Sequence, residues 1–426
     1  MLAIVITTLL LGSATPNVDG PVPLDPRERR LIVRSRRPEQ APPSPTNRVA
    51  DDPRARELGQ RLFFDARLSV NGRIACATCH RPELAFTDGR AVGEGLGRLE
   101  RHTPSLIDVA QQRWFFWDGR SDSLWAQALE PLEHPLEMGS TRVAVVAAVA
   151  ETPTLSHRYE ALFGPLPEVA DMARFPRSAR PDPSDPSNAA DRAWRRMTEG
   201  DRRAIDEAFV NVGKAIAAYE RELRTSNSDF DRFAAAVDRE DAAGMAVLSP
   251  EAQRGLRLFF GKAHCRTCHF GPQFTDREFH NNRIPPSFDP EAKPIPPDPG
   301  RYRGLERLRV NPFNAKSRFN DDPGGPAARR IDAVVQSPRF WANFKTPSLR
   351  NVARTAPYMH RGQVPTLRRV VEYYNTLEGA LPLDHHAETV LVPLGLTDDE
   401  VDDLVAFLES LNSDPLDPAL LQAPKD

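Results

Sequence analysis

Two copies of the pattern Cys-x-x-Cys-His constrain this chain more than any other feature of its sequence. The first copy is CATCH at residues 76–80 and the second is CRTCH at residues 265–269. Together they hold all four cysteines of the 426-residue chain. Two thiols at this spacing can add to the two vinyl groups of one porphyrin, and the adjoining histidine then reaches the iron. The alternatives, a redox dithiol or half of a zinc site, are less apt because no second pair lies near either motif.

Each motif therefore predicts one covalently attached haem c. The predicted attachment residues and proximal iron ligands are Cys76, Cys79 and His80 for haem 1, and Cys265, Cys268 and His269 for haem 2.

The segments around the two motifs repeat each other. GQRLFFDARLSVNGRIACATCHRPELAFTD and RGLRLFFGKAHCRTCHFGPQFTD share RLFF, a connector, the motif, a proline and FTD. Such self-similarity predicts two cytochrome c-like domains that arose by internal duplication. We expect haem 1 in residues 51–225, and haem 2 in residues 226–412, the C-terminal part of which packs back on the first domain. Residues 413–426 are expected to form a tail.

The N-terminus has the character of an export signal. An apolar run within residues 1–20 is followed by small residues. It is too short to span a bilayer, which needs about 20 apolar residues. Covalent haem attachment takes place outside the bacterial cytoplasm, so we expect a periplasmic protein without an integral membrane segment in the mature chain. Residues 21–50, rich in proline and arginine, are interpreted as a linker.

The periodicity predicts a mainly α fold with long irregular loops. Apolar residues from Ile205 to Leu223 recur at helical spacing, and Ser249 and Thr397 are placed to cap helices. Strand-like alternation is almost absent, and the 41 prolines gather in segments such as 165–187 and 284–300. The formal net charge of −3 offers no general attraction to nucleic acid.

The second axial face of each iron decides the function. An iron with an open face can bind an oxidant, whereas an iron with ligands on both faces carries electrons. The nearest histidine after the first motif is His102. The side chains that could reach the second haem are His280, Met359, His360, Tyr373 and Tyr374.

Further motifs give the chain a resemblance to a known family. RHTPSL, FWDGRSDSLWAQALEPLEHPLEMGS and FKTPSLRNVARTAPYMHRG follow one another in order. With the two haem motifs they resemble the bacterial dihaem cytochrome c peroxidases and their MauG relatives over nearly the whole mature chain. Segment 301–322 also resembles the methanobactin-associated subgroup.

This resemblance implies roles for four residues around haem 1. Trp117 would relay electrons between the haems, whereas Trp114 and Trp125 are expected to be core residues. Glu137 would move a proton between the two oxygens of hydrogen peroxide. Gln127 would hold the peroxide by hydrogen bonds, and Pro131 would shape the pocket.

Two departures from the family concern haem 1 and calcium. The loop GRAVGEGLGRLE after the first motif lacks the histidine that closes haem 1 in peroxidases that need reductive activation. Haem 1 is therefore expected to be open, as in MauG. Thr355 and Pro357 match carbonyl donors of an interdomain calcium ion, but His102 stands where the family has an asparagine. Imidazole is a poor ligand for this oxygen-seeking cation.

The third departure lies at haem 2, where Tyr374 replaces the usual methionine ligand. Leu367, Val371 and Tyr374 share a helix face that Tyr373 does not. Met359 is the alternative ligand, and a core tyrosine is the structural alternative for Tyr374. A phenolate stabilises ferric iron, which suits a haem that shares oxidising equivalents.

The resulting hypothesis is a MauG-like enzyme that uses hydrogen peroxide to oxidise a tryptophan of a secreted partner protein at a distance. The first alternative is a detoxifying peroxidase supplied with electrons by a small cytochrome c or cupredoxin. The second is a dihaem electron-transfer protein without enzymatic activity, which would need neither Glu137 nor an open iron.

Overall fold

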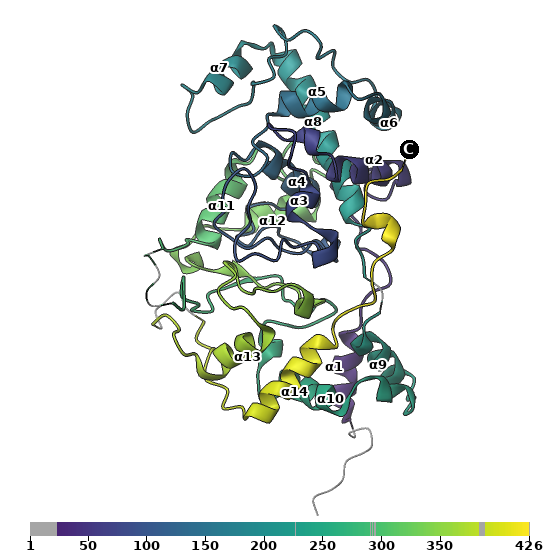
Figure 1. Cartoon of the computed structure of the whole chain (residues 1–426), viewed down its shortest axis with the longest axis vertical. Helices are drawn as coiled ribbons and strands as arrows, with labels where there is room; N and C mark the ends of the chain where they lie inside the picture. The colour runs from purple at the N-terminus through teal and green to yellow at the C-terminus, as the bar shows by residue number, and fades with distance from the viewer. Residues whose placement is uncertain are drawn as a thin grey trace, which may run out of the picture.

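The computed structural model describes residues 24–225, 227–289, 291, 293, 295–382 and 388–425. The predicted signal at residues 1–20 lies outside these ranges. Within them the chain is mainly helical with long irregular connections, as the sequence predicts (Figure 1). None of the helices in the described part of the chain is long and apolar enough to cross a membrane.

The α-helices are listed here in chain order. They are α1 (Pro26–Arg34), α2 (Pro53–Phe63), α3 (Cys76–Cys79), α4 (Leu124–Glu133), α5 (Arg142–Ala150), α6 (Pro153–Phe163), α7 (Ala189–Arg196), α8 (Glu199–Glu220), α9 (Asp229–Asp238), α10 (Pro250–Phe260), α11 (Arg301–Val310), α12 (Pro326–Ala333), α13 (Leu367–Thr376) and α14 (Asp398–Glu409).

Short 3₁₀ turns and one small sheet complete the secondary structure. The turns are η1 (Ala66–Leu68), η2 (Pro82–Leu84), η3 (Val109–Gln111), η4 (Gly244–Val247), η5 (Cys265–Thr267), η6 (Pro338–Phe340), η7 (Val352–Arg354) and η8 (Pro418–Leu420). Strands β1 (Phe279–His280) and β2 (Phe344–Lys345) pair antiparallel, with Phe279 opposite Lys345.

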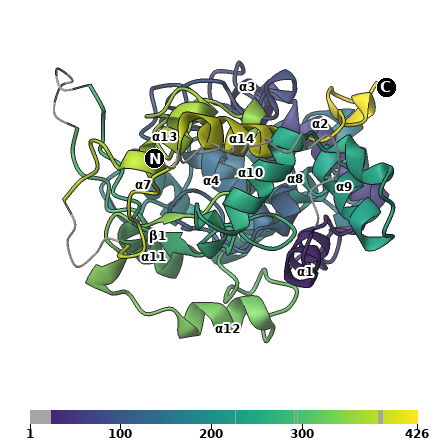
Figure 2. The ribbon, with the colours of Figure 1, turned by 90° about the horizontal axis from the view of Figure 1, so that it is seen from below.

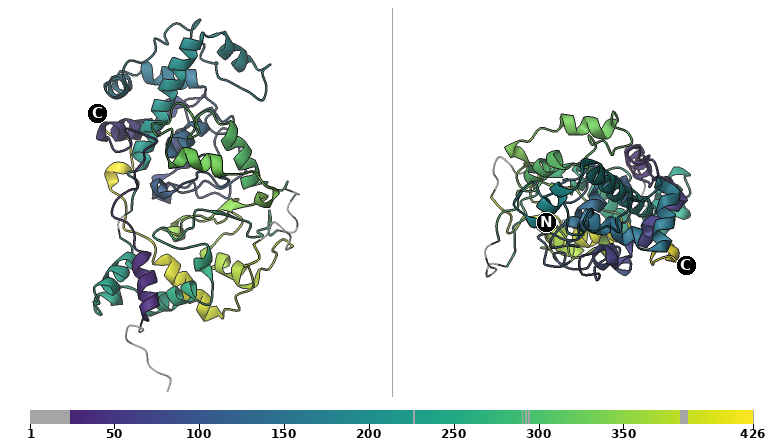
Figure 3. Two further views of the ribbon diagram at one scale, coloured as in Figure 1. Left: turned by 180° about the vertical axis from the view of Figure 1, so that it is seen from behind. Right: turned by 90° about the horizontal axis from the view of Figure 1, so that it is seen from above.

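Two hydrophobic cores lie at opposite ends of the long axis of the molecule. One is built on α2, α4, α5 and α8, and the other on α9, α10, α13 and α14. Figure 1 shows these groups at the top and bottom, and Figure 3 shows the irregular segments that run between them. The boundary predicted at residues 225/226 falls between α8 and α9. Helix α12 stands at the edge of the molecule (Figure 2).

The same helix crossing occurs in both halves. Gly59 of α2 and Gly255 of α10 occupy equivalent places, directly before the repeated apolar run. A Cβ atom on Gly59 would lie 1.8 Å from the carbonyl oxygen of Ala215 in α8. A Cβ atom on Gly255 would lie at the same 1.8 Å from the carbonyl oxygen of Asp403 in α14. Both crossings therefore bring backbone against backbone, and only glycine fits there.

The predicted helix signals are confirmed. Ser249 accepts a hydrogen bond from the backbone N–H of Ala252, and Pro250 begins α10. Thr397 and Glu400 form a capping box on α14. The helical apolar face predicted from Ile205 onward is buried within α8. The described residues of the proline-rich segments 165–187 and 284–300 are irregular, as expected.

Part of the segment interpreted as a linker, residues 21–50, is helical. Pro26–Arg34 forms α1, which begins with a capping box between Asp25 and Glu28 and buries Ile32 in the second core. The abundant arginines suggested a solvated chain, but Asp25, Pro26 and Glu28 carry a strong helix start.

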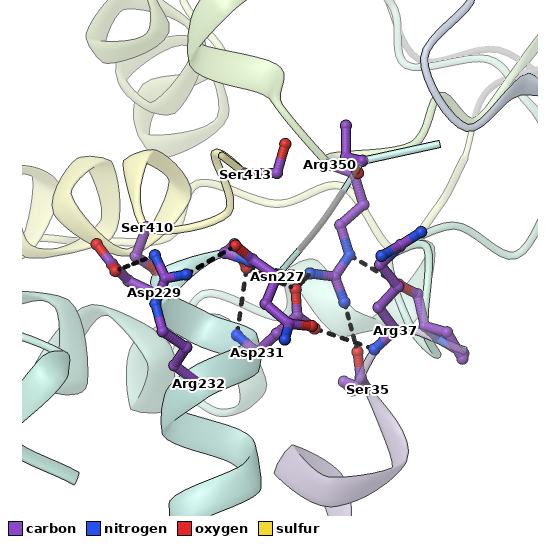
Figure 4. Close-up of polar contacts among 12 residues, drawn as sticks. Ser35, Arg37, Asn227, Asp229, Asp231, Arg232, Arg350, Ser410 and Ser413 are labelled. Atoms are coloured by element: carbon purple, nitrogen blue, oxygen red, sulfur yellow. Dashed lines mark hydrogen bonds and ion pairs between the residues drawn. The ribbon is translucent and has the colours of Figure 1, made fainter. Parts of the chain in front are cut away.

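A buried ion pair fixes the chain just after α1 (Figure 4). The guanidinium of Arg350 lies 2.7 Å from Asp231 Oδ2, and both side chains are at most 3% exposed. Arg350 also donates to the carbonyl oxygen of Ser35 at 2.8 Å, and the backbone N–H of Arg37 donates to Asp231 at 3.0 Å. Further along, Asn47 donates to the carbonyl oxygen of Lys214 in α8. The N-terminal segment thus contacts both halves.

The C-terminal tail returns to the first half, as the end of the ribbon shows (Figure 1). The side-chain amide of Gln60 in α2 donates to the carbonyl oxygens of Ala419 and Gln422 at 2.6 and 2.7 Å. The hydroxyl of Tyr219 donates to the carbonyl oxygen of Leu420 at 2.5 Å. The residues after 412 therefore cover the crossing of α2 and α8.

Candidate functional site

One cavity of about 590 Å³ lies between the two halves and receives side chains from both motifs. His80 and Cys79 line it from the first half, and Cys265, Cys268 and His269 line it from the second. The two predicted haem positions therefore open into one continuous space.

The two proximal histidines are held in the same way. His80 Nδ1 lies 3.0 Å from the carbonyl oxygen of Phe86, and His269 Nδ1 lies 2.8 Å from that of Phe274. A hydrogen bond at Nδ1 orients the ring and leaves Nε2 for a metal. Burial lowers the pKa of both histidines, so both rings are neutral at pH 7, as iron ligation requires.

The four cysteines differ from those of a redox dithiol. All four are free thiols. Burial raises the pKa of Cys79 to about 11 and that of Cys265 to about 12, whereas redox dithiols have lowered values. In the described part of the chain, one group could hold a metal ion, formed by Cys268, Asp276 and His280. It has three ligands instead of the four of a structural zinc site.

A turn after α4 places Glu137 on the cavity wall, beside Gln127 and Pro131. The backbone N–H groups of Glu137 and Gly139 both donate to the carbonyl oxygen of His134 at 3.0 Å, which folds the chain back. The loop at residues 93–97 packs on this turn, and a Cβ atom on Gly95 would lie 2.7 Å from the Glu137 backbone. The loop without a histidine is therefore fixed against Glu137.

The polar atoms of this wall are available to a bound molecule. Gln127 Oε1 is buried without a hydrogen-bond partner among the described residues. Burial raises the pKa of Glu137 to about 7, and Arg120 partly opposes this shift. His134 Nδ1 lies 3.4 Å from Glu137 Oε1, and the His134 side chain is 38% exposed, so it links Glu137 to solvent. Such an environment suits acid–base work near neutral pH.

Trp117 lines the cavity and is tied to both halves. Its indole N–H donates to the carbonyl oxygen of His102 at 2.9 Å. Its own carbonyl oxygen accepts from the backbone N–H of Lys345 in β2 at 2.8 Å. Trp114 and Trp125 are 4% and 1% exposed and pack in hydrophobic clusters, as predicted for core residues.

Tyr374 and Met359 both line the cavity on the side of the second motif. Asn282 Nδ2 donates to the Tyr374 hydroxyl at 3.1 Å and lies 3.7 Å from Met359 Sδ. Burial raises the pKa of Tyr374 to about 12. The neighbouring Tyr373 instead donates to the carbonyl oxygen of Asn282 and packs on Phe288. Tyr374 lines the cavity together with Leu367 and Val371, in line with the sequence pattern, whereas Tyr373 is buried in the second core.

His280 and His360, two other candidate ligands of the second iron, contact protein groups other than Asn282. Both ring nitrogens of His280 are engaged, at 2.7 Å from Asp276 and 2.7 Å from Glu388. The His360 ring stacks on Phe344 with centroids 3.7 Å apart.

The sequence reasoning missed Asn282, His134 and Lys345. Lys345 is half-buried and lines the cavity, and burial lowers its pKa to about 8. Its ammonium group donates to Gln112 Oε1 at 3.2 Å. A half-buried cation beside a haem-sized space matches the anionic propionates that haem carries. Lys345 lies in the quoted FKTPSLRN run, but only the three-dimensional structure shows its burial.

The comparisons with known proteins agree with this geometry. Residues 53–239 match the family model of the di-haem cytochrome c peroxidases. Methylamine utilization protein MauG of Methylorubrum extorquens is 32% identical over 396 residues, 92% of this chain and 88% of that protein. Cytochrome-c peroxidase IdrP1 of Denitromonas iodatirespirans is 33% identical over 385 residues, 89% of this chain and 88% of that protein.

A solved structure shares the fold over most of the chain. The crystal structure of a MauG-like protein associated with microbial copper homeostasis aligns with a TM-score of 0.61 at 26% identity. The alignment covers 91% of this chain and 98% of that one.

The fold and the shared cavity define an oxidoreductase of the peroxidase type with two haem cofactors. The chain belongs to the family of dihaem cytochrome c peroxidases and MauG proteins.

Proposed function

We propose that this chain is a periplasmic, MauG-like enzyme that uses hydrogen peroxide to oxidise a tryptophan of a secreted partner protein. When bound, the two haems supply peroxide activation and the storage of oxidising equivalents. The cavity fits two such groups because it joins both motifs and is lined by the unpartnered Gln127 oxygen and the half-buried Lys345 cation. Cys76, Cys79, Cys265 and Cys268 would form the thioether bonds, and His80 and His269 would bind the two irons.

The wall formed by Glu137, Gln127 and Pro131 handles peroxide. Gln127 orients the molecule by hydrogen bonds, and Pro131 limits the space around it. The Glu137 carboxylate accepts the proton of the near peroxide oxygen and returns it to the far oxygen, which leaves as water. The observation that carries this proposal is the half-buried Glu137 carboxyl, with a pKa near 7, in the cavity that the partnerless Gln127 oxygen also lines. His134 exchanges protons between Glu137 and solvent.

Trp117 conducts electrons between the two sites, because it lines their common cavity and is bonded to both halves. The Tyr374 oxygen would also bind the second iron, and Asn282 orients this hydroxyl. An anionic oxygen ligand there favours a site that holds oxidising equivalents until a partner protein delivers electrons.

The first test measures what the protein carries and how it meets peroxide. The denatured polypeptide should retain two haems by pyridine haemochrome assay and mass. The resting oxidised protein should show one high-spin and one low-spin haem and react with peroxide without prior reduction. One haem per chain, or two low-spin haems at rest, contradicts the proposal.

A detoxifying cytochrome c peroxidase is the second candidate. It is supported by relatives named cytochrome-c peroxidase and by the position of Met359, whose sulfur lies near the same Asn282 amide as the Tyr374 hydroxyl. Fast turnover with reduced small cytochrome c or cupredoxin distinguishes it from the first proposal. It would use the same Glu137 and Gln127.

A further inference from the structure

His102 joins three parts of the molecule at the junction of the two halves. Its side chain is buried, with the whole residue 5% exposed. Its backbone N–H donates to the carbonyl oxygen of His360 at 2.8 Å, and its carbonyl oxygen accepts from the Trp117 indole at 2.9 Å. Its ring Nδ1 lies 2.7 Å from the carbonyl oxygen of Arg90, in the loop after the first motif. The backbone of Thr355, in the second half, lies close enough to the ring to oppose the lowering of its pKa by burial.

These contacts place an imidazole where the family resemblance implies a calcium ion. That ion would need an oxygen donor at position 102 together with the carbonyl oxygens of Thr355 and Pro357. Position 102 offers nitrogen, which Ca²⁺ disfavours, and the buried His102 ring is already hydrogen-bonded to the carbonyl oxygen of Arg90. The residues present therefore do not fit calcium.

The nearby carboxylates are also engaged. Asp88 accepts from the Thr103 hydroxyl at 3.0 Å. Asp118 and Asp298 lie 2.7 and 2.8 Å from the guanidinium of Arg101. A divalent cation at this junction would have to compete with Arg101 for Asp118 and Asp298. This competition lowers the affinity below that which backbone carbonyl oxygens alone could provide.

We propose that the His102 imidazole takes the place of the interdomain calcium ion, and that the junction of the two halves in this chain is independent of calcium. His102 bridges the two halves, because its ring is hydrogen-bonded to the backbone of Arg90 in the first half and its backbone N–H to the carbonyl oxygen of His360 in the second. The bridge also sets the position of the carbonyl oxygen that holds Trp117. This inference concerns the junction and does not depend on the identity of the oxidised substrate.

The test measures calcium binding to the holoprotein by isothermal titration calorimetry, and metal content by mass spectrometry after equilibration with calcium and gel filtration. The wild-type protein should bind no calcium, and EGTA should change neither its melting temperature nor its haem absorption spectrum. His102→Asn supplies an amide oxygen in place of the imidazole nitrogen, so this variant should bind one calcium ion per chain. Its melting temperature should then fall when EGTA is added.

A matched control separates the site from the general effect of losing a histidine. His157 is exposed on α6, and His157→Asn should bind no calcium. If His102→Asn fails to fold, His102→Gln offers the same amide oxygen on a longer side chain. Calcium bound to the wild-type protein with EGTA-sensitive melting would overturn the inference. A folded His102→Asn or His102→Gln protein that binds no calcium would also overturn it.

Discussion

The indole N–H of Trp117 donates to the backbone carbonyl oxygen of His102, so the residue between the two haem motifs is held by a hydrogen bond to the interdomain junction. Trp117→Phe keeps an aromatic ring but removes this donor. We expect peroxide to be consumed at an unchanged initial rate, while transfer of oxidising equivalents to the second haem slows markedly. Stopped-flow absorption at wavelengths specific for each haem measures the two steps separately. Unchanged transfer to the second haem would contradict the relay role.

The pKa of Glu137 near 7 predicts how the peroxide reaction depends on pH. The carboxylate form accepts the proton, so the second-order rate constant should rise as the pH passes through about 7 and then level off. Glu137→Gln should slow the reaction by about 10²–10⁴-fold and remove this pH step. Glu133→Gln is a control, because Glu133 pairs with Arg142 away from the cavity. A Glu137→Gln protein with the wild-type pH profile would rule out the assignment.

Two substitutions test which side chain binds the second iron, at Tyr374 and at Met359. Both residues lie near the side-chain amide of Asn282. Tyr374→His should leave both haems attached but change the low-spin absorption and electron paramagnetic resonance spectra. It should also shorten the life of the oxidised state that both haems share after peroxide addition. Met359→Leu should leave these spectra as they are. A thioether-type spectrum that is lost in Met359→Leu, together with fast oxidation of reduced cytochrome c, would assign the chain to the detoxifying peroxidases.

The crossing of α10 and α14 depends on the missing side chain of Gly255. Gly255→Ala puts a methyl group against the Asp403 carbonyl and should destabilise the protein by about 1–3 kcal/mol or more. Gly324→Ala is the matched control, because nothing lies within 4 Å of its added Cβ atom. Denaturant unfolding followed by circular dichroism gives both values. Equal stability of the two variants would show that the helices can move apart at little cost.

Local signals in the sequence predicted much of the fold. Ser249 and Thr397 lie directly before the apolar runs that they cap, so the starts of α10 and α14 follow from neighbouring residues alone. The Asp25–Glu28 capping box has the same character, but the surrounding arginines suggested a solvated linker. Their role depends on partners far along the chain, such as Asp231 for the backbone of Arg37, and spacing cannot reveal these partners.

The candidate site also combines residues that local motifs predict with contacts that the sequence cannot reveal. The sequence named the cavity-lining residues Glu137, Gln127 and Tyr374 because they belong to motifs. It could not show that Asn282 contacts Tyr374, or that the His102 ring reaches the loop of Arg90. Those contacts arise when segments distant in the sequence fold against one another.

The twin crossings at Gly59 and Gly255, together with the His80–Phe86 and His269–Phe274 hydrogen bonds, have an evolutionary consequence. The scaffold and the predicted proximal side of each half are alike, as expected of a duplicated unit, so we expect the differences between the two haem sites to lie in the segments that cover their distal faces. Those segments are consequently the natural units to exchange between relatives when a dihaem protein with a new division of labour is engineered.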